Sequence, residues 1–375
     1  MADKLAGKVV QHVNSTHDGG GVAEILRRMV PLMQGLGIDT RWNIIKGDQR
    51  FFRTTKKFHN VIQGREESIR TKEFSRILEP SQGAVEEFLH ADFIVIHDPQ
   101  PISLVSKRLG SGGKWIWRCH IDVSDPPEEV WSFIQEFVIQ YDAAIFSAPS
   151  FTQSLPVRQY LIAPSIDPFS DKNKELSEDE IDMVCAKHHI PRDKPIVTQV
   201  SRFDHFKDPV GVIQAFEMVK KEIDCRLVLA GGTASDDPES EEVLIQVRKH
   251  AADIKDIHVL LLPPDSDIEI NALQRASAVI VQKSLKEGFG LTVSEAMWKK
   301  KPVVASAVGG IVLQIENNIS GLLCHNVEGT AAAVKKLLSD PTCARRLGEN
   351  AREHVRQNFL ITRHLRDYLS LFLSV

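Results

Sequence analysis

Residues 278–298 read AVIVQKSLKEGFGLTVSEAMW, in which an apolar run is followed by a glycine turn and then by a segment of helical character. The run 278–281 is short, apolar and β-rich, which is typical of a strand buried on both faces of a parallel sheet. Gly288 and Gly290 permit a sharp turn, and a helix is predicted to begin just after them. A strand, a turn and a helix in this order form the repeating unit of doubly wound α/β folds.

Short β-rich runs of the same kind recur along the chain, separated by segments long enough to form helices. Because strands that alternate with helices indicate parallel sheets covered on both faces, the sequence predicts an α/β protein with two doubly wound, Rossmann-like domains. The predicted strands of the first half are Val9–Ser15, Arg41–Lys46, Phe93–His97, Trp115–Ile121, Ala143–Ser147 and Tyr160–Ala163. Those of the second half are Pro195–Ser201, Arg226–Ala230, His258–Leu262, Ala278–Gln282, Pro302–Ala305 and Gly321–Cys324.

The series of predicted strands pauses between Pro164 and Pro195. This interval holds several prolines and the acidic run ELSEDEID at residues 175–182, a composition that suits an exposed linker. We therefore predict an N-terminal domain over residues 1–165, a linker over 166–190 and a second domain over 191–355. Residues 356–375 place apolar side chains at helical spacing, which predicts a C-terminal helix that caps the fold.

Composition and charge exclude several classes of protein. Of the 375 residues, 46 are Lys or Arg and 50 are Asp or Glu, and the net charge of −4 argues against binding of nucleic acid through bulk positive charge. No stretch approaches the roughly 18 apolar residues of a membrane span, and the opening residues lack the apolar core of a signal peptide. The five cysteines are odd in number and never spaced as C-x-x-C, so we expect a reducing, cytoplasmic setting.

A glycine-rich turn follows the first predicted strand, in the sequence HVNSTHDGGGVAEIL at residues 12–26. Gly19, Gly20 and Gly21 let the backbone approach a ligand closely, and the free N–H groups of the following helix favour an anion. A dinucleotide fingerprint would need Gly or Ala where Glu24 stands, so this loop taken alone is a weak nucleotide signal. A strand–helix turn without a ligand is an equal alternative.

Two carboxylates, Glu287 and Glu295, flank the turn in residues 278–298. Because a helix begins just after the glycines, exposed amides there form a seat for an anion at the carboxyl end of a parallel strand. Carboxylates accept bidentate hydrogen bonds, so each can bind a pair of sugar hydroxyls. Arg202 and Lys207 leave another strand end, where their charges can neutralise a departing diphosphate. Together these groups indicate a nucleotide-sugar donor, although each one singly also suits an exposed surface position.

At these residues the sequence resembles glycosyltransferase family 4, whose GT-B fold consists of two Rossmann-like domains facing across a cleft. EGFGLTVSE at residues 287–295 matches the family's E-x7-E motif, and Arg202 and Lys207 match its Arg-x4-Lys pair. Gln314 stands where many members carry an acid. Within the family, the likeness to the trehalose glycosyltransferring synthases is closer. The strings that carry it are HVNST at 12–16, VIHDPQP at 95–101, WRCHID at 117–122, QVSRFD at 199–204 and DDPE at 236–239.

The resemblance implies roles for individual residues, with the second domain binding the donor and the first binding the acceptor. Arg202 and Lys207 would hold the diphosphate, while Glu287 would bind the donor glucose and Glu295 the ribose. Other donor contacts would come from Gly20, Gly21, Gly288, Phe289, Gly290, Leu291 and Thr292. His120 would lie near the reacting sugar, and the acceptor hydroxyls would be bound by His97, Asp98, Gln100, Arg118 and Asp122. The predicted catalytic residues are thus Arg202, Lys207, Glu287 and His120.

Two of these residues also have purely structural interpretations. His120 suits a hydrogen-bonded histidine at a strand end, and Asp98 suits a helix cap or a turn. The sequence Asp265-Ser-Asp267 is similar to the metal-binding D-x-D of other glycosyltransferases, but it follows two prolines after a strand, so a solvated turn is favoured. We therefore expect no metal site, and a metal ion that is not required or only stimulates the reaction.

The resemblance implies a retaining enzyme that transfers glucose from a nucleoside-diphosphate glucose (ADP-, UDP- or GDP-glucose) to free glucose, giving α,α-trehalose reversibly. It implies no tightly bound cofactor, small-molecule substrates as the partners and a possible homo-oligomer. Alternatives within this chemistry are a retaining trehalose phosphorylase, and a family 4 glycosyltransferase with another acceptor. Two alternatives involve no glycosyl transfer. They are a dehydrogenase that binds NAD through residues 19–21 and Asp48, and a non-catalytic sensor of sugar nucleotides.

Overall fold

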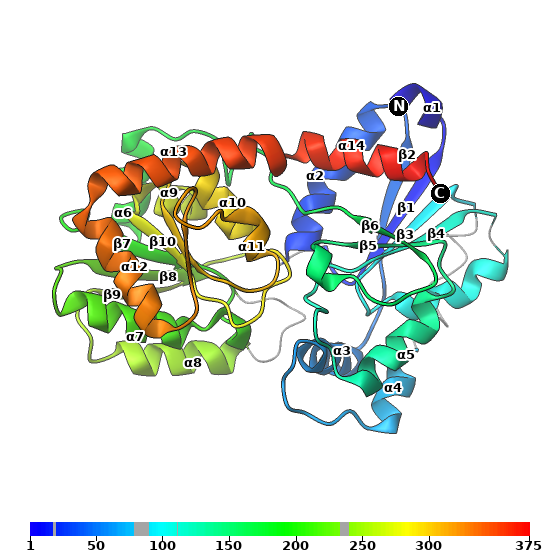
Figure 1. Cartoon of the computed structure of the whole chain (residues 1–375), viewed down its shortest axis with the longest axis horizontal. Coiled ribbons are helices and arrows are strands. Elements are labelled where there is room, and N and C mark those ends of the chain that lie inside the picture. The colour runs from blue at the N-terminus through cyan, green and yellow to red at the C-terminus, as the bar shows by residue number, and fades with distance from the viewer. Residues whose placement is uncertain (18–19, 79–89, 111, 233–239) are drawn as a thin grey trace. The chain divides into compact units, whose positions relative to one another are not determined.

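The computed structural model describes residues 1–17, 20–78, 90–110, 112–232 and 240–375. The described chain forms two compact units, each built around its own parallel sheet (Figure 1). Among the described residues, the first unit contains those of 1–164 and 361–375, and the second contains 165–232 and 240–360. Every predicted strand is present, with its ends shifted by a few residues at most, and the predicted α/β class is confirmed.

The first unit holds a six-stranded parallel sheet in the order β2-β1-β3-β4-β5-β6. Its inner strands carry apolar residues that are buried on both faces, as in other parallel sheets. The strands are β1 Val9–Asn14, β2 Asp39–Ile44, β3 Phe93–His97, β4 Lys114–Arg118, β5 Ala143–Phe146 and β6 Arg158–Leu161. The helices are α1 Ala2–Leu5, α2 Gly21–Gly35, α3 Gln49–Ile62, α4 Thr71–Ile77, η2 Ile102–Gly110, α5 Glu128–Val138, η3 Pro149–Phe151 and α14 Ile361–Phe372.

Helices of the first unit begin where the sequence supplies caps and apolar spacing. The Asp48 carboxylate accepts a hydrogen bond of 2.7 Å from the backbone amide of Phe51, so it caps α3. Asp48 is the residue that a dehydrogenase would use for ribose, and here it has a structural role. In α2, Leu26, Met29 and Met33 are buried at helical spacing.

The second unit holds a six-stranded parallel sheet in the order β12-β11-β10-β7-β8-β9. Its strands are β7 Ile196–Val200, β8 Arg226–Gly231, β9 Ile257–Leu261, β10 Val279–Gln282, β11 Val303–Ser306 and β12 Leu322–Cys324. Its helices are α6 Glu178–Lys187, η4 His205–Lys207, α7 Pro209–Lys220, α8 Ser240–Ala251, α9 Asp267–Ala276, α10 Leu291–Trp298, α11 Ile311–Gln314, α12 Val327–Ser339 and α13 Pro341–Asn358.

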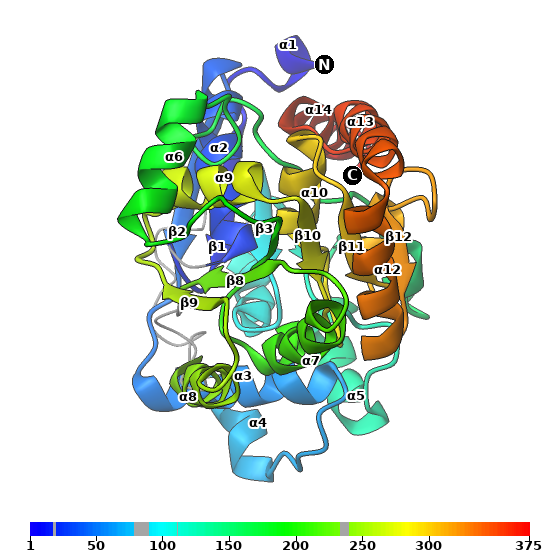
Figure 2. The ribbon, with the colours of Figure 1, turned by 90° about the vertical axis from the view of Figure 1, so that its left-hand side faces the viewer.

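Helices cover both faces of the second sheet (Figure 2). Alternate strand residues point to opposite faces. Leu227 and Leu229 of β8 therefore pack toward α7, α8 and α12, whereas Val228 packs toward α6 and α9. The two apolar layers enclose the strands and fix the positions of their carboxyl ends.

Residues 166–190 differ from the expected exposed linker. They contain α6, whose Ile181 and Cys185 are buried in one apolar layer of the second unit. Glu178, Asp179 and Glu180 of the acidic run lie in the first turn of this helix, where carboxylates interact favourably with the helix dipole. Ser177 and Glu180 complete a capping box at its start.

The predicted C-terminal helix is α14, which belongs to the first unit, where it packs beside α2. Arg363 anchors its start by donating hydrogen bonds of 2.7 and 2.9 Å to the carbonyls of Ala163 and Pro164. Just before α14, Ile166 forms a parallel bridge with Leu360 within the second unit. Helix α14 is thus an integral part of the first unit rather than an added cap.

Each sheet has one point at which the strand order reverses direction. In the first unit this switch point lies between β1 and β3, and in the second it lies between β7 and β10. The loops that leave two such strands turn to opposite faces, which opens a crevice at their carboxyl ends where ligands of doubly wound sheets bind. Most of the predicted site residues follow these strands, whereas Arg118, His120 and Asp122 lie at or just after the end of β4.

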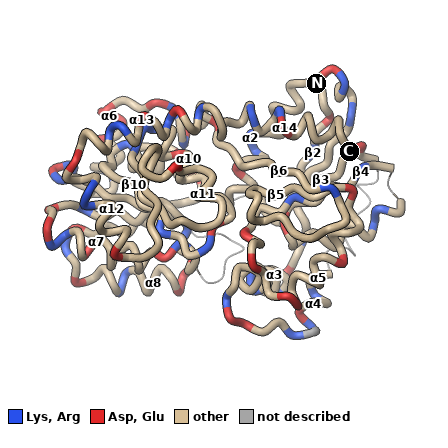
Figure 3. Tube along the Cα trace, in the orientation of Figure 1, with Lys and Arg blue, Asp and Glu red and all other residues tan. Residues whose placement is uncertain are grey.

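Positive and negative residues are interspersed along both units (Figure 3). None of the helices in the described parts of the chain combines the length and apolar character needed to cross a membrane.

Candidate active site

The loops that follow β7 and β10 are tied to each other at the switch point of the second unit. The backbone amide of Leu285, in the loop after β10, donates a hydrogen bond of 2.8 Å to the carbonyl of Phe206, in the loop after β7. The side-chain amide of Gln199 donates one of 2.8 Å to the carbonyl of Lys207. These bonds hold in one arrangement the two loops that carry Arg202, Lys207 and Glu287, three of the four predicted catalytic residues.

Lys207 and Glu287 form an ion pair across these loops, and their side chains are largely buried. The hydroxyl of Ser284 donates a further hydrogen bond of 3.0 Å to Glu287 Oε2, the same oxygen that Lys207 contacts. Because a buried polar group requires hydrogen-bond partners, these contacts fix the orientation of the Glu287 carboxylate. The structure thus brings together two residues that lie 80 positions apart and were predicted separately.

A second ion pair at the switch point joins Lys283 to Asp208, and the sequence analysis did not predict it. Asp208 adopts a left-handed backbone conformation with φ of 45°, and its carboxylate accepts a hydrogen bond of 3.0 Å from the amide of Gly211. The pair places another cation directly after β10. Its signal in the sequence is the position of Lys283, one residue beyond the strand.

Arg202 leaves the same strand end as Lys207. Its guanidinium lies 3.9 Å from the carboxylate of Asp204, and about a third of its side chain is exposed. Asp204 in turn accepts a hydrogen bond of 2.8 Å from the amide of Phe206 and so fixes the turn that leads to Lys207. Arg202 is therefore accessible to an anion at this edge of the sheet.

The conformation of the glycine turn before α10 requires glycine at two positions, Gly290 and Gly310. Gly290 has φ of +83°, a backbone conformation that side chains disfavour, and it is the N-cap of α10. Gly310 packs so closely on the turn that a Cβ there would lie 2.4 Å from the carbonyl oxygen of Gly288. Its amide donates a hydrogen bond of 3.1 Å to the carbonyl of Glu287.

Gln314 is fully buried behind this turn and sets the direction of its peptide groups. Its side-chain amide donates to the carbonyls of Phe289 and Gly290, the latter at 3.3 Å, while its oxygen accepts from the hydroxyl of Ser294. In a trans peptide the N–H points opposite to the C=O, so the amides of Gly290 and Leu291 point away from Gln314. The glutamine that departs from the family pattern thus orients the predicted amide seat.

Glu295 lies near the middle of α10 and is almost completely buried. The ammonium of Lys172 lies 4.0 Å from the Glu295 carboxylate and 3.5 Å from the Asp267 carboxylate, so it forms ion pairs with both. Asp267 is the first residue of α9, which places the Asp265-Ser-Asp267 sequence at a helix start. Within the described residues, no group of three His, Cys, Asp or Glu side chains has the arrangement of a metal site.

In the first unit, three histidines from neighbouring strands form a hydrogen-bonded chain. His12 Nδ1 lies 2.9 Å from His97 Nε2, and His97 Nδ1 lies 2.9 Å from His120 Nε2. His12 belongs to β1, His97 ends β3, and His120 follows β4. Burial lowers the pKa of His12 to about 3 and holds those of His97 and His120 well below the usual value, with Arg118 adding to the shift. All three rings are therefore neutral at physiological pH.

Arg118 and Asp98 lie against this chain of histidines. Arg118 is fully buried and donates a hydrogen bond of 3.1 Å to Ser147, but its Nε and Nη1 have no hydrogen-bond partner among the described residues. The Asp98 carboxylate accepts one of 2.7 Å from the backbone amide of His120. Burial raises the pKa of Asp98 to about 7, against the opposing effects of that amide and of Arg118.

The other predicted residues of the first unit have structural contacts of their own. Asp122 accepts hydrogen bonds from the amide and the hydroxyl of Ser124, at 3.0 and 2.6 Å, and so closes a turn. Gly20 and Gly21 are the N-cap and the first residue of α2. Gly19 and the DDPE string at 236–239 lie outside the described residues.

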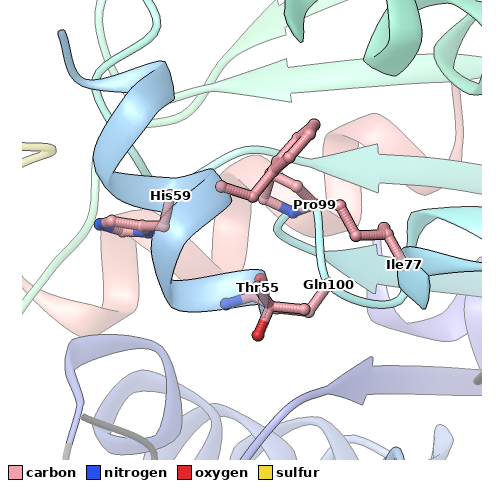
Figure 4. A pocket seen from close by; sticks show the side chains of 6 residues that line it. Thr55, His59, Ile77, Pro99 and Gln100 are labelled. Atoms are coloured by element: carbon pink, nitrogen blue, oxygen red, sulfur yellow. The ribbon is translucent and has the colours of Figure 1, made fainter. Parts of the chain in front are cut away.

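Gln100 lines a small pocket in the first unit, together with side chains of α3 and α4 (Figure 4). The pocket has a volume of about 10 Å³, which is room for roughly one water molecule. Gln100 Oε1 is buried, and no described residue lies within hydrogen-bond distance of it. The lining residues are Thr55, Phe58, His59, Ile77, Pro99 and Gln100.

Comparison with known proteins identifies the class. Residues 12–153 match the trehalose synthase N-terminal domain, and residues 182–354 match the glycosyl transferases group 1 family. A sucrose-phosphate synthase from Thermosynechococcus elongatus superposes with a TM-score of 0.76 at 19% identity, over 98% of this chain and 100% of that chain. An α,α-trehalose-phosphate synthase (UDP-forming) from Burkholderia vietnamiensis gives 0.78 at 14% identity, over 99% of each chain. The protein is a GT-B glycosyltransferase, and the predicted fold is confirmed.

The chain is 44% identical to a trehalose synthase of Thermococcus litoralis, over 100% of this chain and 92% of that protein. A trehalose synthase of Rubrobacter xylanophilus is 43% identical, over 99% of this chain and 92% of that protein. A trehalose phosphorylase of Grifola frondosa is 31% identical over 95% of this chain, but over only 56% of its own length. The chain belongs to the trehalose synthase family, and the phosphorylase alternative is not favoured.

Proposed function

We propose that this enzyme transfers glucose from a nucleoside-diphosphate glucose to free glucose and forms α,α-trehalose reversibly, with retention at the donor's anomeric carbon. The observation that carries the proposal is the Lys207–Glu287 pair beside the glycine turn, at the switch point of the second unit. A paired carboxylate suits sugar hydroxyls, and cations with exposed amides suit a diphosphate. Membership of the trehalose synthase family supports the same donor and product.

In this proposal the second unit binds the donor. Lys207 and Arg202 hold the diphosphate, Glu287 binds the glucose, and the amides of the turn from Gly288 to Thr292 contact glucose and phosphate. Gln314 supports this seat from behind, since it bonds to the carbonyls whose amides face the opposite way. Buried Glu295 binds the ribose hydroxyls. The charges are in place before the donor binds, so little reorganisation is needed as the leaving group departs.

The first unit supplies the acceptor contacts in this proposal, through polar groups at the ends of β3 and β4. Asp98, Gln100, Arg118 and Asp122 are the proposed acceptor-binding residues, and His120 lies by the reacting sugar. His97 belongs to this set through its hydrogen bond to His120. Arg118 is the one cation in this set, whereas a sugar-phosphate acceptor would call for more cations. The mixed polar set therefore favours a neutral sugar.

The proposed chemistry is a front-face attack by the acceptor hydroxyl. A bond forms between the acceptor oxygen and the donor's anomeric carbon, while the bond from that carbon to the phosphate oxygen breaks. The acceptor proton passes to the leaving phosphate, and Arg202 and Lys207 stabilise the negative charge that develops there. The cations at the diphosphate are side chains, so we propose that no metal ion is required.

The product tests this proposal. Enzyme incubated with unphosphorylated glucose and ADP-, UDP- or GDP-glucose is expected to yield α,α-trehalose, identified by its NMR spectrum, with equal yield in a chelator. Trehalose plus a nucleoside diphosphate is expected to regenerate the nucleotide glucose. A β linkage, a strict need for glucose 6-phosphate, or product only with inorganic phosphate would each overturn the assignment. Activity that is lost in the chelator and restored by magnesium or manganese would overturn the metal-free part alone.

The amide seat gives a separate prediction. Gln314→Glu removes the donor that orients the carbonyls of Phe289 and Gly290 and sets a carboxylate against them. We expect the KM for the nucleotide sugar to rise about tenfold, the effect of losing roughly one hydrogen bond's worth of organisation. Gln246→Glu, on the exposed surface of α8, is the matched control. An unchanged KM in a stably folded Gln314→Glu enzyme would show that the seat does not depend on this side chain.

A further inference from the structure

The three histidines of the first unit are joined by hydrogen bonds to one another, an arrangement that acceptor binding alone does not require. Because β1, β3 and β4 are neighbours in the sheet, His12, His97 and His120 lie in a row, joined by two contacts of 2.9 Å. The rings of His97 and His120 are stacked, with their planes 16° apart. His12 and His97 are buried, whereas His120 is partly exposed.

The number of N–H hydrogens on the three imidazole rings limits the directions that their hydrogen bonds can take. A neutral imidazole has one N–H donor and one acceptor nitrogen. His97 uses both ring nitrogens within the chain, so it donates to one neighbour and accepts from the other. Either all the hydrogens point toward His120, which then carries its own hydrogen on Nδ1, or all point toward His12, which then carries its hydrogen on Nε2.

The environment of His12 decides between these two arrangements. His12 Nε2 is buried and has no hydrogen-bond partner among the described residues. In the second arrangement this nitrogen would carry an N–H with no acceptor, whereas in the first it is a bare acceptor. Buried N–H groups without a partner are the rarer of the two in folded proteins. The closed end also gives no route for a proton to enter the chain from His12.

We infer that His12 and His97 are positioning residues that lock His120 in the tautomer with its hydrogen on Nδ1, so that His120 offers a hydrogen-bond donor and not a base. This inference deepens the proposed function and rests on it for the ligand, a hydroxyl oxygen of a bound sugar. His120 Nε2 is already occupied by the hydrogen of His97, so the ring has no free nitrogen with which to take the acceptor's proton. The leaving phosphate is therefore the group that accepts the acceptor's proton.

Nitrogen NMR tests the tautomer without any substrate. In the full-length enzyme labelled with ¹⁵N-histidine at pH 7, long-range ¹H–¹⁵N spectra are expected to show His120 protonated on Nδ1 and bare on Nε2. Its signals are assigned by their loss in His120→Asn. A hydrogen on His120 Nε2 would overturn the inference. Since the spectrum needs no activity, failure of the proposed glucose transfer cannot be mistaken for failure of the tautomer lock.

Paired substitutions at His120 test the donor role. The amide nitrogen of Asn sits near the position of Nδ1 and donates, whereas Asp has the same shape but only accepts. His120→Asn is expected to keep kcat within about tenfold of the wild type, and His120→Asp to lower it about 10²-fold. Equal losses in both folded variants would count against a donor at this position.

The pH profile tests the role of His97. In His97→Ala, Nε2 of His120 loses its donor, so His120 can protonate. Activity is then expected to gain an acidic limb below the ordinary histidine pKa of about 6.5, because burial and Arg118 still lower the pKa of His120. His97→Asn retains a donor toward His120 and is expected to lack that limb. The other groups facing the chain are Arg118, Asp98, His364 and Tyr368, and they are the same in both variants. Matching profiles for His97→Ala and His97→Asn would overturn the positioning role.

Discussion

Replacing Lys207 by alanine is expected to lower kcat about 10²-fold or more, and Arg202→Ala is expected to do the same. Both side chains leave the carboxyl end of β7, where the proposed diphosphate departs with increasing negative charge. Removal of one preorganised group that stabilises such charge typically costs about 10²- to 10³-fold in kcat. The measurement is steady-state transfer at saturating nucleotide sugar and glucose.

Lys207 also neutralises Glu287, so its removal leaves a buried carboxylate without its cation. The melting temperature of each variant therefore has to be measured beside kcat, to separate loss of folding from loss of charge stabilisation. Lys221→Ala, which changes an exposed lysine just after α7, is the control and should leave kcat unaltered. Near-normal kcat in both Arg202→Ala and Lys207→Ala would remove these residues from the catalytic role.

The two carboxylates of the E-x7-E motif are expected to give opposite kinetic patterns. Glu287→Ala should lower kcat about 10²-fold, because Glu287 is beside the reacting glucose in the proposed complex and holds Lys207 in place. Glu295→Ala should raise the KM for the nucleotide sugar about tenfold with little change in kcat, since ribose contacts are alike in the ground and transition states. Initial rates over a range of donor concentrations separate the two effects.

Lys172 is the main complication for Glu295, because its ammonium lies between Glu295 and Asp267. Asp267→Asn perturbs the same lysine without touching Glu295 and is the appropriate control, with an expected KM close to that of the wild type. If Glu295→Ala lowered kcat and Glu287→Ala raised KM, the proposed roles of the two carboxylates would have to be exchanged.

The strands were predictable because each is a short apolar run between turn signals, and burial in a parallel sheet requires that pattern. The helix α6 was missed because its acidic first turn resembles a charged linker. The Ser177–Glu180 capping box was the available signal, since a hydroxyl followed three positions later by a carboxylate marks a helix start. The unit to which α14 belongs depends on contacts between residues about 200 positions apart, such as Arg363 with Ala163, and no local pattern encodes them.

Residues of the candidate site that belong to a sequence motif could be predicted, whereas the contacts between them could not. Glu287 and Lys207 stand out by spacing, but their pairing is visible only once β7 and β10 lie side by side. Gln314 looked like a departure from the family pattern. Its hydrogen bond to the glycine turn is visible only in the folded structure. His12 lies in a string that was noted, and its place in line with His97 and His120 follows from strand order.

The placement of α14 has a consequence for the order in which the protein folds during synthesis. Residues 1–164 leave the ribosome first, yet Tyr368, Leu369 and Phe372 of α14, which are buried in the first unit, emerge just over 200 residues later. The described residues of the second unit, 165–232 and 240–360, all lie between these two segments of the first unit, so the second unit can fold in the interval. Its Ile166–Leu360 bridge then holds the residues that flank it side by side, which shortens the loop that α14 must close to complete the first unit. The second unit is thus expected to mature before the unit that carries the histidine chain.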